Sequence, residues 1–433
     1  MAAVAAVLGT WAAVPAAHAA TVKVEPVPAV SPAIAGLPAG VQRVLGTRAV
    51  TPVASAASSV VFGALWGVAC KHAGDCLGTG EHDTSTTATA TADLWAGSSW
   101  RATGLHLPGG ATQGVLADDS YAPNVLMAVG YYVKGSDSYP VDNIWTGTSW
   151  GMGPHQPVIP SGEQYAVLES VSCTSSTFCL ASGYYSPKSN PGEEIPLVEL
   201  WNGSSWKLTP PPRPTSAPLA NLDAASCVAN PASPTKSSCV VTGVNATSTG
   251  LQAWAESFDG EHWKNLNIPQ PQGSSSGPWL DAVTGVSCSS TTSCALVGTE
   301  TQLTATGGSS KGFAETLANG TWTVATVDPS STKGSELNSV DCLSSTFCVA
   351  AGGVGPYNTP VMGEGDVAVW NGSTWTPTLI NPGANIGSEL TGIDCTSTTY
   401  CVAVGTHGRY GSGSGTATSA FYNGATWSQH TAP

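Results

Sequence analysis

Residues 390–408 read LTGIDCTSTTYCVAVGTHG, and residues 419–433 read SAFYNGATWSQHTAP. The first segment holds two cysteines, followed by an apolar run that ends in glycine. The second segment holds an apolar run that ends at Tyr422, just before Asn423-Gly424, and it resumes at Trp427. The same two segments recur upstream six times at a spacing of about 54 residues, and such a period is the signature of a repeat architecture.

Five of the upstream units are easily aligned on their cysteines, and one unit has none. The cysteine segments begin at residues 340, 286, 226, 171 and 68, and the corresponding unit without cysteines reads NVLMAVGYY at 124–132. The second segments are VAVWNGSTWTP (367–377), AETLANGTWTV (314–324), AESFDGEHWKN (255–265), VELWNGSSWKL (198–208), DNIWTGTSWGM (142–152) and ADLWAGSSWRA (92–102).

Each unit reads as four strands, which we name a to d by their order within the unit. Strand a ends at the first cysteine, strand b is the apolar run after the second, strand c ends before the Asn-Gly-like pair, and strand d begins at the next tryptophan. Pairs such as Asn202-Gly203 suit a tight c–d hairpin, since its turn needs positive φ; they also match glycosylation acceptors, but turn chemistry explains them without sugar. The sequence therefore predicts an all-β, seven-bladed β-propeller with four antiparallel strands per blade.

A string of small independent domains is the alternative architecture, but units of about 54 residues with few large apolar side chains could hardly supply a core each. We expect the chain to divide into a signal peptide at 1–19, a Pro/Ala-rich linker at 20–58 and the propeller at 59–433. The expected blades are, approximately, 59–108, 109–160, 161–214, 215–272, 273–329, 330–382 and 383–433.

The twelve cysteines form six pairs, one in every unit except the second. An even count in an exported chain indicates disulfides. Because each pair flanks one a–b hairpin, its members can face each other across the two strands. Metal ligation is the competing interpretation, but the spacing is not that of a zinc knuckle and no histidine recurs beside the pairs. The expected disulfide pairs are Cys70–Cys76, Cys173–Cys179, Cys227–Cys239, Cys288–Cys294, Cys342–Cys348 and Cys395–Cys401.

Composition and the N-terminal residues limit the partners. The formal net charge is -14 with 14 Lys and Arg, and no cationic cluster exists, so a nucleic-acid partner is not expected. Residues 17–19 read Ala-His-Ala after an apolar stretch, which resembles a signal-peptide cleavage site, although a disordered Ala-rich tail is the alternative. We expect a secreted monomer without a transmembrane segment.

Propeller topology predicts which face binds. The a–b and c–d turns share one face, while the b–c and d–a connections share the other, where we expect long polar loops such as 133–140, 186–195, 301–312 and 355–366. The position two residues after the strand-b glycine lies on that rim, and the position four residues before the first cysteine lies at the central channel. The candidate ligand-binding residues are His82, Tyr132, Tyr185, Asn245, Glu300 and His407 on the rim, and Glu169 and Asp223 at the channel.

Polar side chains at such positions also occur simply because water reaches them, and the recurrent tryptophans beside the c–d turn are expected to serve packing. A shallow pocket with tyrosines, two imidazoles (His82 and His407, on neighbouring blades of a closed ring) and carboxylates would suit a sugar or a cation. No cofactor is implied, although calcium in the channel is conceivable.

The c–d segments resemble the end of the Asp-box of BNR (sialidase-like) propellers, with G-x-[ST]-W at residues 203–206, 372–375 and 424–427. The chain also resembles secreted bacterial repeat proteins with paired cysteines, and it shares the repeated-blade pattern of WD40/YVTN-like propellers. It departs from the Asp-box where that motif has its Asp, since Trp201, Trp370 and Tyr422 stand there. Sialidases bind their substrate through an Arg triad, and the three arginines after the linker, Arg101, Arg213 and Arg409, do not suit one pocket.

We therefore expect a non-catalytic extracellular binding or scaffold protein that takes carbohydrate or a protein partner on the b–c/d–a face. A polysaccharide- or glycoside-acting hydrolase or lyase that uses channel carboxylates or rim histidines is the alternative, and a surface-layer or spore-coat role is a third possibility. No complete catalytic constellation is recognisable in the sequence, and no catalytic residue is assigned.

Overall fold

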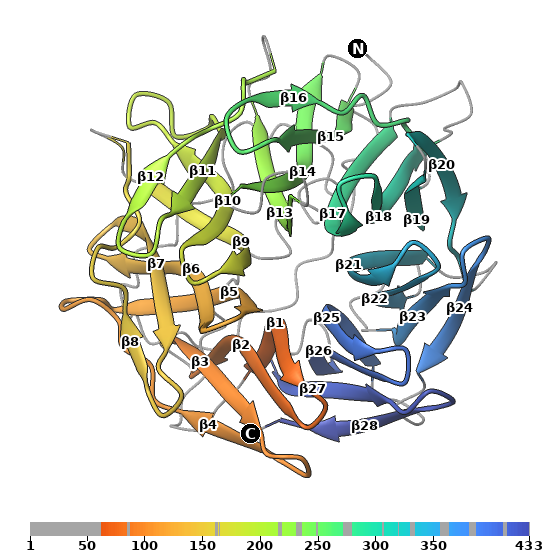
Figure 1. The fold of residues 1–433 in the computed structure, drawn as a ribbon, viewed down its shortest axis with the longest axis horizontal. Coiled ribbons are helices and arrows are strands. Elements are labelled where there is room, and N and C mark those ends of the chain that lie inside the picture. Colours follow the sequence, from red (N-terminus) through yellow and green to blue (C-terminus); the bar gives the residue numbers. More distant parts are fainter. Residues whose placement is uncertain are drawn as a thin grey trace, which may run out of the picture.

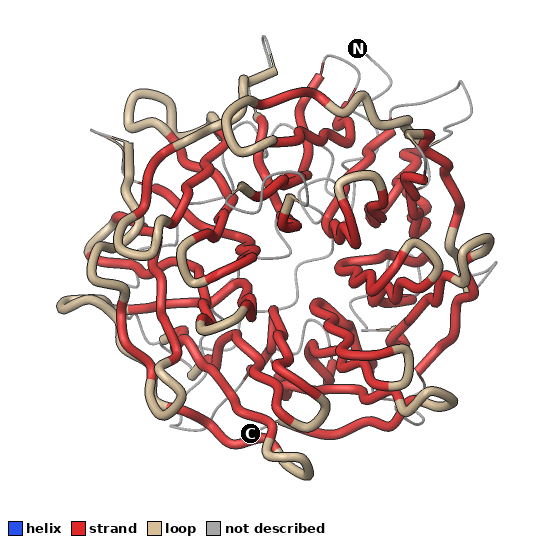
Figure 2. The backbone as a smooth tube through the Cα atoms, in the orientation of Figure 1, coloured by secondary structure: helices blue, strands red, loops and turns tan. Residues whose placement is uncertain are grey.

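The computed structural model describes residues 62–432 in large part. The described region excludes residues 85–86, 161–162, 164, 215–218, 231–235, 248–249, 272–278, 305–306, 319, 330–333, 356–362, 381–386 and 410–413. The expected signal peptide and linker lie outside the described residues. Figure 2 shows that the described chain is built from strands and loops. No helix in this part of the chain is long and apolar enough to cross a membrane.

The described residues form 28 strands, and their boundaries follow the repeat. The first fourteen are β1 (Phe62–His72), β2 (Asp75–Asp83), β3 (Ala88–Trp95), β4 (Trp100–Thr103), β5 (Gln113–Ala122), β6 (Val125–Lys134), β7 (Asp137–Trp145), β8 (Trp150–Met152), β9 (Tyr165–Ser175), β10 (Phe178–Ser186), β11 (Ile195–Trp201), β12 (Trp206–Leu208), β13 (Ala220–Ala229) and β14 (Ser237–Thr247). The other fourteen are β15 (Gly250–Phe258), β16 (Trp263–Asn265), β17 (Trp279–Ser290), β18 (Ser293–Thr304), β19 (Gly307–Ala318), β20 (Thr321–Thr326), β21 (Gly334–Ser344), β22 (Phe347–Gly355), β23 (Glu364–Trp370), β24 (Trp375–Ile380), β25 (Gly387–Ser397), β26 (Tyr400–Arg409), β27 (Ser414–Tyr422) and β28 (Trp427–Thr431).

Consecutive strands pair antiparallel in groups of four, which we call meanders 1 to 7 in chain order. Meanders 1, 6 and 7 are separate four-stranded sheets. Single parallel bridges, Ser138 with Tyr165 and Leu251 with Leu280, join meanders 2 and 3 and meanders 4 and 5 into two eight-stranded sheets. The meanders stand around a common centre with the first strand of each innermost, which is the arrangement of a β-propeller (Figure 1).

Among the described residues no strand is shared between the first and last meanders, because meander 7 consists only of the C-terminal strands β25 to β28. Meander 1 packs directly on it, and Leu65, Trp95 and Phe421 belong to one buried apolar cluster at this boundary. The Trp100 indole also donates to Ser419 Oγ (2.8 Å) across it. The sequence leaves two closures open, by blade packing alone or with an edge strand added at residues 41–50, and residues 41–50 lie outside the described residues.

In every meander the second strand carries a glycine, because the first strand has a bulge that approaches it closely. In meander 6 the pairing skips Asn338, and a Cβ placed on Gly352 would lie 2.0 Å from the Glu336 carbonyl oxygen. Each of the other six meanders repeats this geometry, so only glycine fits at the centre of the second strand. The seven glycines, at which an added Cβ would meet a carbonyl oxygen at 1.9–2.1 Å, are Gly80, Gly130, Gly183, Gly243, Gly298, Gly352 and Gly405.

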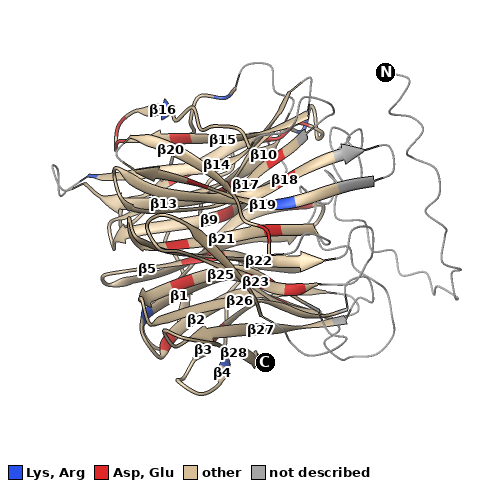
Figure 3. Cartoon of the chain, turned by 90° about the vertical axis from the view of Figure 1, so that its right-hand side faces the viewer, with Lys and Arg blue, Asp and Glu red and all other residues tan. Residues whose placement is uncertain are grey.

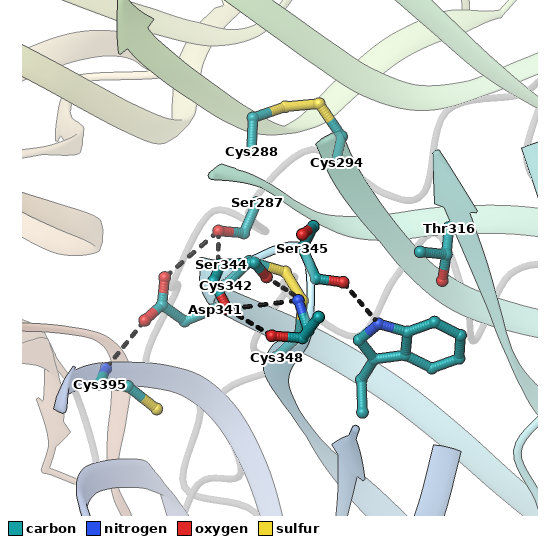
Figure 4. Close-up of a disulfide and its surroundings, with 12 residues drawn as sticks. Ser287, Cys288, Cys294, Thr316, Asp341, Cys342, Ser344, Ser345, Cys348 and Cys395 are labelled. Carbon is teal, nitrogen blue, oxygen red and sulfur yellow. Dashed lines mark hydrogen bonds between the residues drawn. A yellow bond between two sulfur atoms is a disulfide. The ribbon is translucent and has the colours of Figure 1, made fainter. Parts of the chain in front are cut away.

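Six hydrogen bonds connect the inner strands around the ring, and we call them seam bonds. The donor of each is the backbone N–H of the first cysteine in a meander. The acceptor is a side chain of the previous meander, one residue before the position that is equivalent to that cysteine. Figure 4 shows Asp341, which accepts from the Cys395 N–H (3.0 Å) and from Ser287 Oγ (3.2 Å). The remaining acceptors are Ser120 for Cys173, Ser172 for Cys227, Ser226 for Cys288, Ser287 for Cys342 and Asp394 for Cys70.

All six predicted disulfides are present, and each joins facing residues of one a–b hairpin. Their Cα–Cα distances are 3.9–4.0 Å. The Asn-Gly turns are also as expected: Asn202 Oδ1 accepts from the Ser204 and Ser205 N–H groups, and Gly203 has φ 96°. The paired tryptophans pack, since Trp206 is 6% exposed and its indole donates to Asp142 of the previous meander (3.0 Å).

Removing one disulfide should lower the free energy of unfolding by an amount that depends on the loop it closes. Cys288 and Cys294 are 6 residues apart, so the double Cys→Ser variant should lose about 2 kcal/mol on the chain-entropy model. Cys227 and Cys239 are 12 residues apart, and the doubled loop adds about 0.6 kcal/mol. Urea unfolding measures both, and an equal or reversed order would contradict the entropic account.

Candidate functional site

The central cavity lies among the inner strands of all seven meanders and has a volume of about 200 Å³. The bulged position of each inner strand borders this space. The seven bulge residues are Trp66, Ala117, Glu169, Asp223, Thr284, Asn338 and Thr391. The structure thus brings the two channel candidates, Glu169 and Asp223, to one cavity.

Three bulge side chains connect neighbouring meanders. Thr284 Oγ1 donates to the Leu337 carbonyl (2.7 Å), Asn338 Nδ2 to the Leu390 carbonyl (2.9 Å) and Thr391 Oγ1 to the Leu65 carbonyl (2.6 Å). Each donor therefore bonds to the backbone carbonyl that directly precedes the bulge residue of the next meander. These three polar side chains therefore hold neighbouring meanders together.

The opposite side of the cavity is acidic. Asp118 Oδ2 accepts from Ser170 Oγ (2.7 Å) and from the Val171 N–H (3.0 Å), and Asp119 Oδ1 accepts from Thr79 Oγ1 (2.8 Å). Glu169 and Asp223 follow on the next two inner strands. Burial raises the pKa of Asp119 well above its usual range, and the Asp118 charge adds to this.

Sequence reasoning missed Trp66, Asp118 and Asp119. Meander 2 has no cysteine, so its channel positions cannot be counted from that mark. Its a–b hairpin is also one residue shorter, which places the bulge at Ala117 instead of at the position that an equal-length hairpin would give. Trp66 lies four residues before Cys70, at the same position as Glu169 before Cys173, but its apolar indole is not a ligand-binding candidate by residue type.

Each of the six rim candidates lies on the second strand of a different meander. None of these six described residues lines the central cavity. Tyr132 stacks on Tyr139 across β6 and β7, with ring centroids 5.3 Å apart. Tyr185 packs on the buried cluster of meanders 2 and 3, and burial raises the pKa of its hydroxyl. Asn245 is half-buried and pairs with Ala220 and Gln252.

The two rim histidines occupy neighbouring meanders, but no hydrogen bond or ring contact joins them within the described residues. His82 Nε2 is buried without a hydrogen-bond partner, and its ring lies against the backbone of Gly63. His407 is partly exposed, and burial lowers the pKa of its imidazole. The expected approach of the two rings stays a prediction.

Glu300 is the centre of a row of charged residues across three strands. It pairs with Asp281 on β17 and with Lys311 on β19. Asp281 is 5% exposed, and burial together with the Glu300 charge raises its pKa to about 7. Burial also raises the pKa of Glu300, while Lys311 opposes this. Only Glu300 of this row is a sequence candidate, because cross-strand pairing is needed to find the other two.

A second buried carboxyl pair lies on β2. Glu81 and Asp83 project to the same face because they are two residues apart on a strand. Burial and the Asp83 charge raise the pKa of Glu81 to about 8, and burial raises that of Asp83 to about 6. Both carboxyls retain buried oxygens without hydrogen-bond partners.

Two of the four segments that the sequence predicts as long loops on the b–c/d–a face lie largely in strands. Residues 133–140 lie largely in β6 and β7, which a turn at Gly135 and Ser136 connects. Strands β18 and β19 likewise extend through most of 301–312. Residues 186–195 form the longer connection that was expected, and much of 355–366 lies outside the described residues. Among the described residues, no group of three or more His, Cys, Asp or Glu is arranged to hold a metal ion.

No protein-family model and no curated protein matches the chain. Solved structures with a similar backbone include "YCF48 bound to D1 peptide", with 11% identity, 81% of this chain and 92% of that chain covered, and a TM-score of 0.44. The fungal Aleuria aurantia lectin, described as a six-bladed β-propeller with fucose recognition, has 14% identity, 73% and 94% coverage and a TM-score of 0.40. The polysaccharide lyase PL25, an ulvan lyase, has 9% identity, 72% and 82% coverage and a TM-score of 0.47. At these identities and TM-scores the likeness assigns no ligand to this chain.

Proposed function

We propose that the chain is a secreted, monomeric, seven-bladed propeller, each meander being one blade, and that it acts as a non-catalytic binding scaffold. The blades have the approximate bounds given by the repeat. The partner is a carbohydrate or an extracellular protein, held at the b–c/d–a face. Six disulfides support an oxidising location, because such bonds persist outside the cytoplasm.

The difference between the two faces carries this proposal. On the a–b/c–d face, the side chains of Asn371 and Asn423 stabilise turns, and each Oδ1 accepts hydrogen bonds from two backbone N–H groups. On the opposite face, Tyr132, Glu300 and His407 are partly exposed and belong to no turn. A rigid ring that presents such side chains fits binding, since recognition residues are usually positioned by a fixed frame.

A glycan array followed by a turnover assay on the best ligand tests the proposal. We expect retention of a glycan without product, and Tyr132→Ala should weaken retention because it removes an aromatic platform. Lys71 lies near the end of β1, beside the a–b turn of the opposite face, and Lys71→Ala should leave retention unchanged. Binding that is insensitive to Tyr132→Ala and Tyr185→Ala would count against the rim.

The Asp281–Glu300–Lys311 row favours one alternative, a glycoside-acting hydrolase or lyase. Two adjacent carboxyl groups with raised pKa values are suited to acid–base catalysis near neutral pH. The same turnover assay decides between the two functions. Product formation by the unmodified chain that is lost in Glu300→Gln, but kept in Glu261→Gln, would establish catalysis and overturn the binding proposal.

A further inference from the structure

Three tyrosines lie close together at the b–c/d–a end of meanders 2 and 3, and we call them the tyrosine cluster. Tyr131 is on β6, Tyr165 is the first residue of β9, and Tyr184 lies two residues before the end of β10. The ring centroids of Tyr165 and Tyr184 are 5.9 Å apart. Burial raises the pKa of the Tyr131 hydroxyl, and the nearby Tyr165 hydroxyl adds to this rise. The cluster therefore spans the boundary between the two meanders.

The tyrosine cluster is not part of the apolar core. Each of its three residues is partly exposed. None of them belongs to, or packs on, a buried apolar cluster of the described residues. By contrast, Tyr132 and Tyr185, which follow Tyr131 and Tyr184 in the chain, both pack on such clusters. Core packing therefore does not account for the tyrosine cluster.

The propeller frame does not require large side chains at this position either. Tyr131 and Tyr184 directly follow the glycine of the second strand in meanders 2 and 3. In meanders 4 to 7 the same position holds small buried residues, which are Val244, Thr299, Gly353 and Thr406. Thr406 Oγ1 donates to the Gly63 carbonyl of meander 1 (3.1 Å), so it connects neighbouring meanders. The two tyrosines thus give one sector of the ring an aromatic surface that meanders 4 to 7 lack at this position.

Carboxyl groups lie beside the tyrosine cluster. Burial is the main cause of the raised pKa of all three hydroxyls, and the Glu169 charge adds to the rise in each case. Glu169 also lines the central cavity, so the cluster adjoins that cavity. Glu194 acts on Tyr165 and Tyr184 in the same way, and its Oε2 accepts from Asn221 Nδ2 (3.0 Å). Aromatic rings, hydroxyl donors and carboxyl groups therefore occur together at this end of the channel.

The charge around the tyrosine cluster favours an uncharged ligand. The chain has 28 Asp and Glu against 14 Lys and Arg, and Figure 3 shows acidic residues spread over the described strands. The described groups that shift the pKa values of the cluster are carboxyls and tyrosines, with no Lys or Arg among them, so an anionic ligand would lack a counter-charge. Burial raises the pKa of Glu194 to about 8, so this carboxyl is largely protonated at neutral pH and attracts a cation little.

We propose that the tyrosine cluster, together with Glu169 and Glu194, binds an uncharged sugar ring of a glycan that enters from the b–c/d–a face. The faces of the tyrosine rings pack on the C–H groups of the sugar, while the tyrosine hydroxyls and the two carboxyls exchange hydrogen bonds with its hydroxyl groups. Aromatic surface with a few orienting polar groups is the usual composition of a ligand site. This inference rests on the proposed function and names its ligand class and its place on the face.

Titration calorimetry of the full chain at pH 6 tests the ligand class. The uncharged probes are the β-1,4-linked hexasaccharides of glucose, mannose and N-acetylglucosamine. Hexagalacturonate is the anionic probe, and the glucosamine hexamer is the cationic probe, which differs from the N-acetylglucosamine hexamer only in its free amino groups. We expect at least one uncharged probe to bind and neither charged probe to do so.

Variants of the tyrosine cluster test the place of binding. Tyr184→Ala should weaken binding of the uncharged probe about tenfold, the loss expected for one aromatic contact. Tyr165→Phe keeps the ring and removes the hydroxyl, and it should weaken binding about fivefold, as expected for one lost hydrogen bond. Tyr121 lies at the other end of the channel, one residue before the end of β5, and Tyr121→Ala should leave binding unchanged. Thermal melts confirm that each variant is folded, and Tyr165→Phe remains informative if Tyr184→Ala is unstable.

The outcomes separate this inference from the proposed function. Binding of no uncharged probe, equal binding of a charged probe, or unchanged binding by both cluster variants would overturn the inference. Loss of binding in Tyr132→Ala, with both cluster variants unaffected, would leave the proposed function with the rim as its site. Retention of only charged glycans on the array would likewise keep the proposed function and remove the tyrosine cluster as its site.

Discussion

Replacing Gly352 by alanine should severely destabilise the native fold. The added Cβ would lie 2.0 Å from the Glu336 carbonyl oxygen and 2.8 Å from Leu337 Cα. Both are backbone atoms of the bulged strand, so no side-chain rotation relieves the overlap. The bulge would have to move, together with Asn338 and its hydrogen bond to the next meander. We expect a loss of more than about 3 kcal/mol, the range of severe packing defects.

The adjacent Gly353 provides the matched control. A Cβ there would come no closer than 3.6 Å, to Glu389 Cγ, which is an ordinary contact. Gly353→Ala should be neutral or slightly stabilising, because alanine restricts the unfolded chain. Urea unfolding of the soluble fractions measures both. Similar stabilities of the two variants would show that the close approach of the bulge is not what selects glycine.

The folded protein should be more stable at pH 5 than at pH 8. Burial raises the pKa of Glu315 to about 8, with a smaller contribution from Asp281, and the Glu315 side chain is fully buried with no hydrogen-bond partner for either oxygen. Its unfolded pKa is near 4.5, so folding takes up a proton over the interval between the two values. The contribution of Glu315 to the free energy of unfolding is thus fully present below its unfolded pKa, and it is lost as pH rises through its folded pKa. Carboxyls with the same direction of shift are Glu81, Glu194, Glu199 and Asp366 (each to about 8).

Melting temperature against pH checks the direction, and we expect a fall of about 10 °C or more between pH 5 and pH 8.5. Glu315→Gln imitates the protonated acid and should raise the melting temperature at pH 8.5 while changing it little at pH 5. Glu261→Gln is the control, because the hydrogen bond and the charge of Lys236 lower the pKa of that exposed group. A melting temperature that rises with pH would mean that the buried carboxyls are ionised and stabilised in the folded state.

The repeat predicts strand order, turns and disulfides well because these depend on local chemistry. Cys70 and Cys76 lie on one hairpin, and Asn202 begins a turn whose geometry its own side chain stabilises. Each of these hairpins, turns and disulfides is determined by residues that lie within about a dozen positions of one another. The same counting rule places Glu169 and Asp223 at the channel, since a register position is repeated in every meander.

The rest of the site could not be predicted because it depends on distances between strands. The counting rule has no cysteine to start from in meander 2, so it misses Asp118 and Asp119. Asp281 and Lys311 become neighbours of Glu300 only through cross-strand pairing. The histidines at 82 and 407 share a register position, but equal register on two neighbouring strands does not fix how far apart two rings lie.

The short reach of the disulfides has a consequence for biogenesis. Every cross-link joins cysteines 6 or 12 residues apart, so under the proposed secretion both partners of a bridge would leave the export channel almost together. Oxidation can therefore follow the emerging polypeptide hairpin by hairpin, and no thiol has to wait for a distant segment. Docking of the last meander on the first is left as a separate, late event that needs no redox chemistry.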